Sequence, residues 1–358
     1  MKSTQLKSIL AFLCLLTSGL FTALTAQTGL TNLSDTSYFM AGEDDWNLVE
    51  AVLRKKPAHI LHLLKRGADP NAAAEGGMTA LQYAAESGDS TSVKLLVLNG
   101  ADIELSPVEN TSPLQVAVLS GHFTICHFLL KKGADPDHLD AHGASALHYA
   151  SAMNNYAIAD LLLFYGANDS LKDRLGNDAL MTAVYFGNLE TADVLLQNGL
   201  GPDSRDSLRS TPLMIAAQQG NKEMIDLLLD YGANPEAVNN QNLTPLSQAV
   251  FHGRDEAVSM LLKKGASPGH QVTGKCNLYD LARQRGNKDI ADTLKARGIG
   301  PSPSPDFSVI EFTWGNSFGG KEHLMQFRLA WVDSKHGYFI ESGFDFRPTP
   351  RTVQVEIS

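Results

Sequence analysis

Glycine recurs every 33 residues through most of this 358-residue chain, and this period limits the possible folds more than any other feature. The positions are Gly67, Gly100, Gly133, Gly166, Gly199, Gly232, Gly265 and Gly298. A fixed period of this length indicates a repeat protein, in which each unit packs only against its neighbours. The sequence therefore predicts an elongated array, not a single closed core, for this part of the chain.

Two further motifs keep the same period and the same phase. Apolar runs begin at 79, 112, 145, 178, 211 and 244, each at Thr, Ser or Asp, as in "TALQYAA" and "TPLMIAA". Turns follow at 88, 121, 154, 187, 220, 253 and 286, as "GD", "GH", "NN", "GN", "GN", "GR" and "GN". Agreement of three motifs over about eight units excludes chance periodicity.

The unit around residue 211 predicts two short helices. Thr211 caps a helix expected to extend to residue 219, Pro212 suits its first turn, and Gly220 ends it. A second helix is expected over 222–231, ended by Gly232 in the left-handed conformation that glycine adopts most easily. Neither helix can bury its apolar face alone, so stacking on neighbouring units must supply the core.

These motifs resemble the ankyrin repeat, whose pattern is T-P-L-H-x-A, then G-H or G-N, then L-L, then G-A-D-x-N. The resemblance covers residues 42–300, with atypical first and last units, "DWNLVEAV" and "NLYDLAR", that suit terminal caps. It implies a mainly α fold, a solenoid of stacked helix-turn-helix units. The histidine position of the motif, occupied by His148, has a structural hydrogen-bonding role in the family.

The resemblance also implies a protein-binding surface on the concave face and hairpin tips. The exposed positions of the first helices include apolar residues where small or polar ones are usual, and aromatic residues often anchor interfaces. The candidate partner-binding residues are Leu119, His142, Met153, Arg174, Tyr185, Phe186, Gln218, Gln219, Asn240, Phe251 and His252. The alternative is that the apolar ones pack against adjacent helices.

Composition and motifs give little support to other functions. A net charge of −10 lacks the overall positive charge that drives nucleic-acid binding. "SPGHQVTGKC" (267–276) resembles a phosphate-binding loop, but Cys276 replaces its Ser or Thr, and the period places the segment at a hairpin tip. His138 and His142 lack further ligands at metal-binding spacing. We expect no cofactor, no metal and no catalytic residue in the repeats.

Two cysteines follow the N-terminal segment, Cys126 and Cys276. They are separated by more than four 33-residue repeats, so at roughly 8–10 Å between helix layers they lie about 40 Å apart. A disulfide cannot span that distance. We therefore expect both thiols to be free and buried.

The first 26 residues have the composition of a secretory signal peptide. Lys2 and Lys7 precede an apolar run, Ile9 to Leu16, and small residues follow up to Ala26. An uncleaved membrane anchor is the alternative. Residues 27–41 are expected to form a linker. Export to the periplasm or outer membrane of a Gram-negative bacterium is predicted, with secretion as the alternative.

In the tail, the pattern of apolar residues changes from one typical of helices to one typical of strands. Residues 301–306 form a proline-rich linker, and 307–358 contain four stretches in which apolar and polar residues alternate, as in amphipathic antiparallel strands. With a signal peptide, such strands resemble part of an outer-membrane β-barrel, either truncated or completed by other subunits. A small soluble sheet is the alternative. Titratable residues gather in this tail, but fifty-odd residues offer little room for a catalytic pocket.

Together these features predict a non-enzymatic protein-binding scaffold of the cell envelope, and the tail predicts tethering to the outer membrane. A soluble secreted binder or inhibitor is the alternative. A third hypothesis is an enzyme whose activity lies in the tail.

Overall fold

The computed structural model describes residues 43–270, 272 and 276–302, and the backbone of three strands within 309–342. The described residues fall into two compact units, one that ends at Pro268 and one that begins at Gly269. The first contains α2 to α15. The second contains α16, α17 and the strands.

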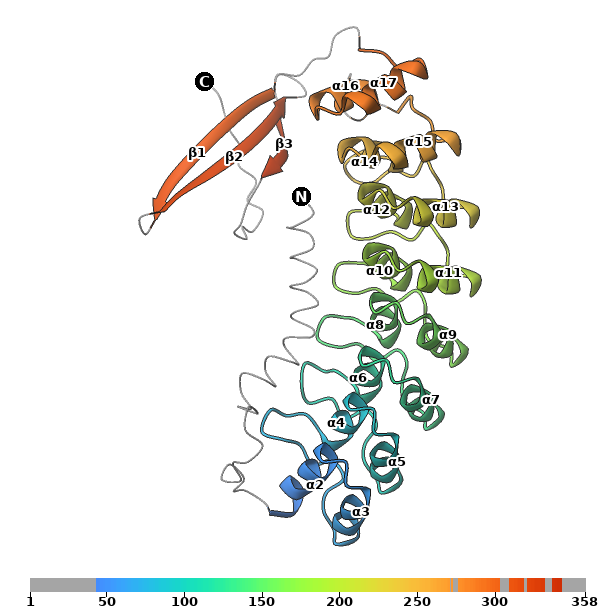
Figure 1. Ribbon diagram of the computed structural model, residues 1–358, viewed down its shortest axis with the longest axis vertical. Helices are drawn as coiled ribbons and strands as arrows, with labels where there is room; N and C mark the ends of the chain where they lie inside the picture. The colour runs from blue at the N-terminus through green and yellow to red at the C-terminus, as the bar shows by residue number, and fades with distance from the viewer. Residues whose placement is uncertain are drawn as a thin grey trace. The chain divides into compact units, whose positions relative to one another are not determined.

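The first unit is a stack of helix pairs (Figure 1). The first helices of the pairs, called the inner helices, are α2 (Glu43–Leu53), α4 (Ala80–Glu86), α6 (Pro113–Leu119), α8 (Ala146–Ala152), α10 (Ala179–Phe186), α12 (Pro212–Gln219) and α14 (Pro245–Phe251). The second, or outer, helices are α3 (Pro57–Lys65), α5 (Ser90–Leu98), α7 (Phe123–Lys131), α9 (Tyr156–Phe164), α11 (Leu189–Gln197), α13 (Lys222–Asp230) and α15 (Asp255–Lys263). The prediction of a mainly α solenoid is confirmed.

The repeat around residue 211 forms as its sequence predicts. The Thr211 hydroxyl accepts a hydrogen bond from the backbone N–H of Met214 (3.4 Å), and Pro212 begins α12. Gly220 ends this helix with φ 79°, and Gly232 follows α13 with φ 85°. Left-handed backbone of this kind favours glycine, which explains why glycine marks the period.

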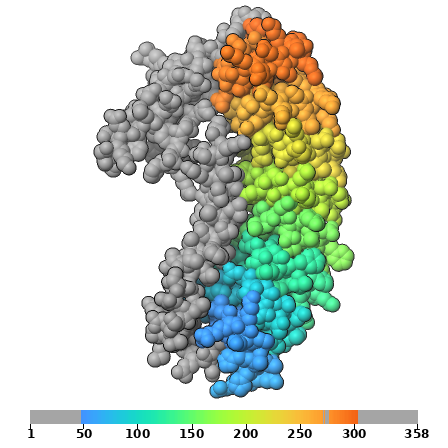
Figure 2. All heavy atoms as spheres, viewed as in Figure 1, coloured from blue at the N-terminus to red at the C-terminus, as the bar shows by residue number. Residues whose placement is uncertain are grey.

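The core is a continuous apolar layer between helix pairs. Leu162, Leu180, Leu195 and Leu228, from four different helices, are fully buried. In α13 the structure buries Met224, Ile225 and Leu228 and leaves the other leucines partly exposed. Neighbouring helix pairs contact each other throughout the stack, and Figure 2 shows successive repeats in close contact along one face, from blue to orange. Each repeat therefore depends on its neighbours for burial.

Polar side chains join one repeat to the next at the ends of inner helices. Asn188 Nδ2 donates to the carbonyls of Ser151 (2.7 Å) and Ala152 (2.9 Å), at the end of the preceding inner helix. Arg254 Nε donates in the same way to Gln218 O (2.8 Å). These bonds satisfy carbonyls that have no partner within their own helix.

The second unit contains a last helix pair, α16 (Leu278–Gln284) and α17 (Lys288–Ala296). Asn277 caps α16 by accepting from the backbone N–H of Asp280 (3.0 Å) and also donates to Gly300 O (3.0 Å). The Asp280 carboxylate accepts from the backbone N–H and the hydroxyl of Ser302. The chain that follows the pair is thus folded back onto α16.

Every helix in the described residues is too short or too polar to cross a bilayer.

Three antiparallel strands follow in the order β1-β2-β3: β1 (Val309–Phe318), β2 (Lys321–Trp331) and β3 (Gly337–Ser342). The β1–β2 register runs from Val309 opposite Ala330 to Phe318 opposite Lys321. The β2–β3 pairing is irregular between Arg328 and Leu329. The fourth predicted strand, at 352–357, lies outside the described residues, as do the predicted signal peptide (1–26) and linker (27–41).

Both cysteines of the described residues are free and buried, as predicted. Burial raises the pKa of the Cys126 thiol, and likewise that of Cys276, to about 12. Because the thiolate is the reactive form, we expect both to resist a disulfide-exchange reagent at pH 8 and to react on addition of denaturant. Mass spectrometry of the labelled peptides checks this. Rapid labelling of either site in the native chain would contradict the expected burial.

Candidate protein-binding surface

Four consecutive hairpin loops project from the stack with one shared backbone structure. They comprise residues 140–144, 173–177, 206–210 and 239–243. In each loop the backbone N–H of the first residue donates to the carbonyl of the last, at 3.1, 2.9, 3.1 and 3.2 Å. The loops therefore present equivalent residues at intervals of 33.

The first side chain of each loop stabilises that loop from within. Asp140 Oδ1 accepts from the backbone N–H groups of His142 (2.8 Å) and Ala144 (2.9 Å). Asp173, Asp206 and Asn239 make the same pair of bonds in the next three loops. This use of Asp or Asn is typical of tight turns, where the side chain replaces a backbone acceptor.

Neighbouring loops are also joined to one another. The N–H groups of Arg174, Ser207 and Asn240 donate to the carbonyls of His142 (3.2 Å), Leu175 (3.3 Å) and Leu208 (3.0 Å), respectively. We call the four joined loops the tip row. The structure thus brings His142, Arg174 and Asn240, three predicted site residues, into one row.

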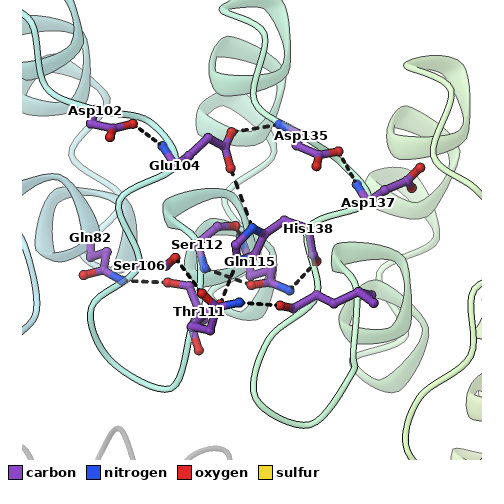
Figure 3. A network of polar contacts seen from close by, with 12 residues as sticks. Gln82, Asp102, Glu104, Ser106, Thr111, Ser112, Gln115, Asp135, Asp137 and His138 are labelled. Atoms are coloured by element: carbon purple, nitrogen blue, oxygen red, sulfur yellow. Dashed lines mark hydrogen bonds and ion pairs between the residues drawn. The ribbon is translucent and has the colours of Figure 1, made fainter.

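A second set of bonds fastens the loops to the inner helices. Gln115 Nε2 donates to the carbonyls of His138 (3.0 Å) and Ala144 (2.8 Å), and Figure 3 shows this side chain between Ser112 and His138. His148 Nε2 lies 3.0 Å from Asn177 O at the equivalent position. The structural hydrogen-bonding role that the ankyrin resemblance implied for His148 is therefore confirmed.

A polar ladder links the repeats beside these loops. The Glu104 carboxylate accepts from the backbone N–H of Asp135 (2.9 Å), and Asp135 in turn accepts from Asp137 (2.9 Å), as Figure 3 shows. Burial raises the pKa of Glu104. These carboxylates are engaged with backbone, so they hold the loops in register.

The predicted residues of the inner helices differ in exposure. Met153 and Tyr185 are 42% and 36% exposed. Leu119, Phe186, Gln218, Gln219, Phe251 and His252 are half-buried. The Tyr185 ring packs edge-on against Phe186, with 5.7 Å between centroids, and its carbonyl accepts from Gln219 Nε2 (2.7 Å). Partial burial raises the pKa of Tyr185 above its ordinary value of 10.0.

Two exposed leucines of the tip row were not among the predicted site residues. Leu175 and Leu208 are 59% and 54% exposed and occupy the same position in adjacent loops. The sequence held one signal for them, since each is an apolar residue in a loop made mostly of polar residues and glycine. The structure also shows exposed aromatic residues on the outer helices, including Phe123 (44%), Tyr156 (52%) and Phe164 (82%).

The histidines near the loops contact carboxylates of the preceding hairpin. His138 Nδ1 lies 3.9 Å from Glu104 Oε2, and His142 Nε2 lies 3.9 Å from Glu109 Oε2. The described residues contain no cluster of three or more His, Cys, Asp or Glu side chains able to hold a metal ion. In the segment that resembles a phosphate-binding loop, Val272 N–H donates to Cys276 O (3.2 Å). The same backbone bond joins the first and last residues of each loop in the tip row. Residues 271 and 273–275 lie outside the described part of the chain.

Comparison with known proteins gives one family and one fold. The family model of ankyrin repeats (3 copies) matches residues 48–140, 109–173, 133–206 and 180–272, which together make up more than half of the chain. The crystal structure of the human ASB11 ankyrin repeat domain aligns with a TM-score of 0.56 and 26% identity, over 63% of this chain and 100% of that one. The search of curated protein sequences gave no match. Ankyrin repeats are protein-interaction modules, and the chain belongs to the ankyrin-repeat family.

Proposed function

We propose that the chain is a non-enzymatic scaffold that binds a protein partner through the ends of its inner helices and its tip row. The observation that carries this proposal is the exposure of Met153 and Tyr185 at the ends of inner helices. A partner that covers large apolar side chains removes their surface from water, which favours binding. Joined loops add a second rigid surface.

Site-specific photo-cross-linking in the cells that produce the protein tests this surface. Benzoylphenylalanine placed at Met153 or Tyr185 should give a discrete adduct with a protein partner. The same group at Phe164, which is 82% exposed on an outer helix, is the matched control and should give none. Adducts from Phe164 alone would place the interface on the outer helices and contradict the proposal.

Substitution should then weaken binding of the partner so identified. The double change Tyr185→Ala and Phe186→Ala should raise its Kd at least about tenfold, since central aromatic residues commonly contribute about 2 kcal/mol or more. Phe164→Ala should leave the Kd unchanged. Isothermal titration calorimetry measures both, and circular dichroism checks that the variants fold.

We further propose that the scaffold acts in the cell envelope, exported by residues 1–26 and held at the outer membrane by residues 307–358. Support comes from Lys2, Lys7 and the apolar run after them, and from alternation in the tail. The pairing of β1 with β2 and of β2 with β3 is compatible with a barrel segment and with a small sheet alike.

Fractionation of producing cells distinguishes these locations. The full chain should begin at Gln27 by N-terminal sequencing and should need detergent for extraction from the outer membrane. A variant that ends at Ser302 should appear in the soluble periplasmic fraction. Release of the full chain without detergent would favour the soluble secreted binder, and an intact Met1 would exclude cleavage.

A further inference from the structure

The sign of the charge on the hairpin loops reverses in the middle of the stack. Residues 73–78, 106–111 and 139–144 each contain one Asp or Glu and no Lys or Arg. Residues 172–177 and 205–210 each contain two basic residues and one Asp, and 238–243 contain no charged residue. In a chain of net charge −10, the adjacent loops at 172–177 and 205–210 therefore form a local basic site.

The acidic residues within these two loops are already engaged. Asp173 Oδ1 accepts from the N–H groups of Leu175 (2.9 Å) and Asn177 (2.8 Å), and Asp206 accepts from Leu208 (2.8 Å) and Ser210 (2.7 Å). Asp203, just before the second loop, accepts from Asn234 N–H (2.9 Å). Asp178, which follows the first loop and is buried, accepts from Met181 N–H (2.8 Å), and Asp169 precedes that loop. The carboxylates of Asp173 and Asp206 therefore bond to the backbone and not to the basic side chains of the loops.

The four basic side chains make no ion pair within the described residues. Lys172 Nζ donates to the carbonyl of Arg205, and Arg205 Nη1 donates to Val238 O (2.9 Å). These bonds to neutral carbonyls fix two of the charges at the loops without compensating them. Arg174 and Arg209 are exposed.

Two leucines lie among these charges. Leu175 and Leu208, 59% and 54% exposed, are at the same position in the two loops, and Leu175 O accepts from Ser207 N–H (3.3 Å). We call Lys172, Arg174, Leu175, Arg205, Leu208 and Arg209 the basic–leucine patch. Its chemistry is that of an interface, with apolar anchors and arginines beside them.

We propose that the basic–leucine patch binds an acidic segment of the protein partner, with an apolar side chain of that segment covering Leu175 and Leu208. Guanidinium groups pair with carboxylates through two parallel hydrogen bonds, which suits Arg174 and Arg209 for this contact. The leucines add burial that a purely charged site would lack. This inference rests on the proposed protein-binding function and names the chemistry of the partner.

Selection from a random peptide library tests the inference before the partner is identified. Phage displaying 12-residue peptides are selected on the immobilised full chain, and enriched sequences are synthesised for fluorescence anisotropy. The enriched peptides should combine Asp or Glu with large apolar residues. The variant Arg174→Glu with Arg209→Glu should bind them at least about tenfold more weakly, and added salt should reduce binding to the unchanged chain.

The control variant Lys94→Glu with Lys131→Glu changes the net charge equally on outer helices and should bind as the unchanged chain does. Leu175→Ser with Leu208→Ser should weaken binding without altering its salt dependence. Failure to enrich any acidic peptide, or equal binding by the Arg174 and Arg209 variant, overturns the inference. Patch-dependent binding to phosphatidylserine vesicles, with no acidic peptide enriched, overturns it in favour of a lipid surface.

The two proposals can fail separately. Loss of cross-links from Met153 and Tyr185 would contradict the protein-binding surface of the inner helices. If those cross-links form while no enriched peptide depends on Arg174 and Arg209, the scaffold function stands and the acidic partner segment does not.

Discussion

Replacing Asp140 with Ala should lower the free energy of unfolding by about 3 kcal/mol, because three donors, two of them buried, then lose their acceptor. Asp140 is 7% exposed, and its carboxylate accepts from the backbone N–H groups of His142 and Ala144 and from the hydroxyl of Tyr149. Tyr149 is 2% exposed, so its hydroxyl is shielded from bulk water. Urea unfolding followed by circular dichroism measures the change.

The chain itself supplies a matched control for this change. Asn239 occupies the equivalent position in the last loop of the tip row and makes both backbone bonds through Oδ1 (2.9 and 3.0 Å). Asp140→Asn should therefore keep the loop bonds and cost about 1 kcal/mol, as should Tyr149→Phe. Equal destabilisation by Asp140→Ala and Asp140→Asn would show that the loop bonds contribute little.

The same site predicts an effect of alkaline pH. Burial, with Asp140 as a further cause, raises the pKa of Tyr149 above its ordinary value of 10.0. The unfolded chain loses the phenolic proton at about pH 10, whereas the folded chain keeps it to higher pH. This contribution to stability is complete below about pH 10 and is lost as the pH rises further. Tyr149→Phe should flatten that decline.

Gly176→Ala should destabilise the chain by about 2 to 4 kcal/mol, the sum of left-handed backbone strain and overpacking. Gly176 has φ 84°, and a Cβ built on it would lie 2.7 Å from the backbone nitrogen of Ser207 in the next loop. A backbone atom cannot move aside as the end of a side chain can. The tip row should therefore separate between Leu175 and Ser207.

Gly166→Ala separates the two causes. Gly166 has nearly the same φ, 83°, but an added Cβ would have no atom within 4 Å. Its substitution should cost only the strain of the left-handed backbone, about 1 to 2 kcal/mol. Chemical denaturation of both variants gives the difference. Equal losses would mean that adjacent loops separate without cost, which would contradict a rigid tip row.

The sequence predicted the repeat well because each local signal agrees with the stacked fold. Thr211, Pro212 and Gly220 fix the ends of a helix through their own backbone chemistry, without contributions from distant residues. The sequence did not distinguish the exposure of the inner-helix candidates. Tyr185 and Phe186 are adjacent and similar in the sequence, yet Tyr185 is exposed and Phe186 is half-buried.

The basic–leucine patch shows the same limit. Lys172, Arg205 and the two leucines recur at 33-residue spacing, so their equivalence is present in the sequence. Their adjacency depends on the bonds between loops of different repeats, which only the tertiary structure shows. Charge counts along the chain show two basic residues and one Asp in each loop, but not that the two loops lie side by side.

By itself the sequence determined the ankyrin solenoid, its period and its helix ends, since these follow from residues within one unit and from repetition of that unit. The tertiary structure alone decided which side chains remain exposed and which charges stay uncompensated. The physical reason is that exposure and the contacts between loops depend on atoms of the neighbouring repeats, roughly 30 residues away in the sequence, which stacking brings within hydrogen-bonding distance.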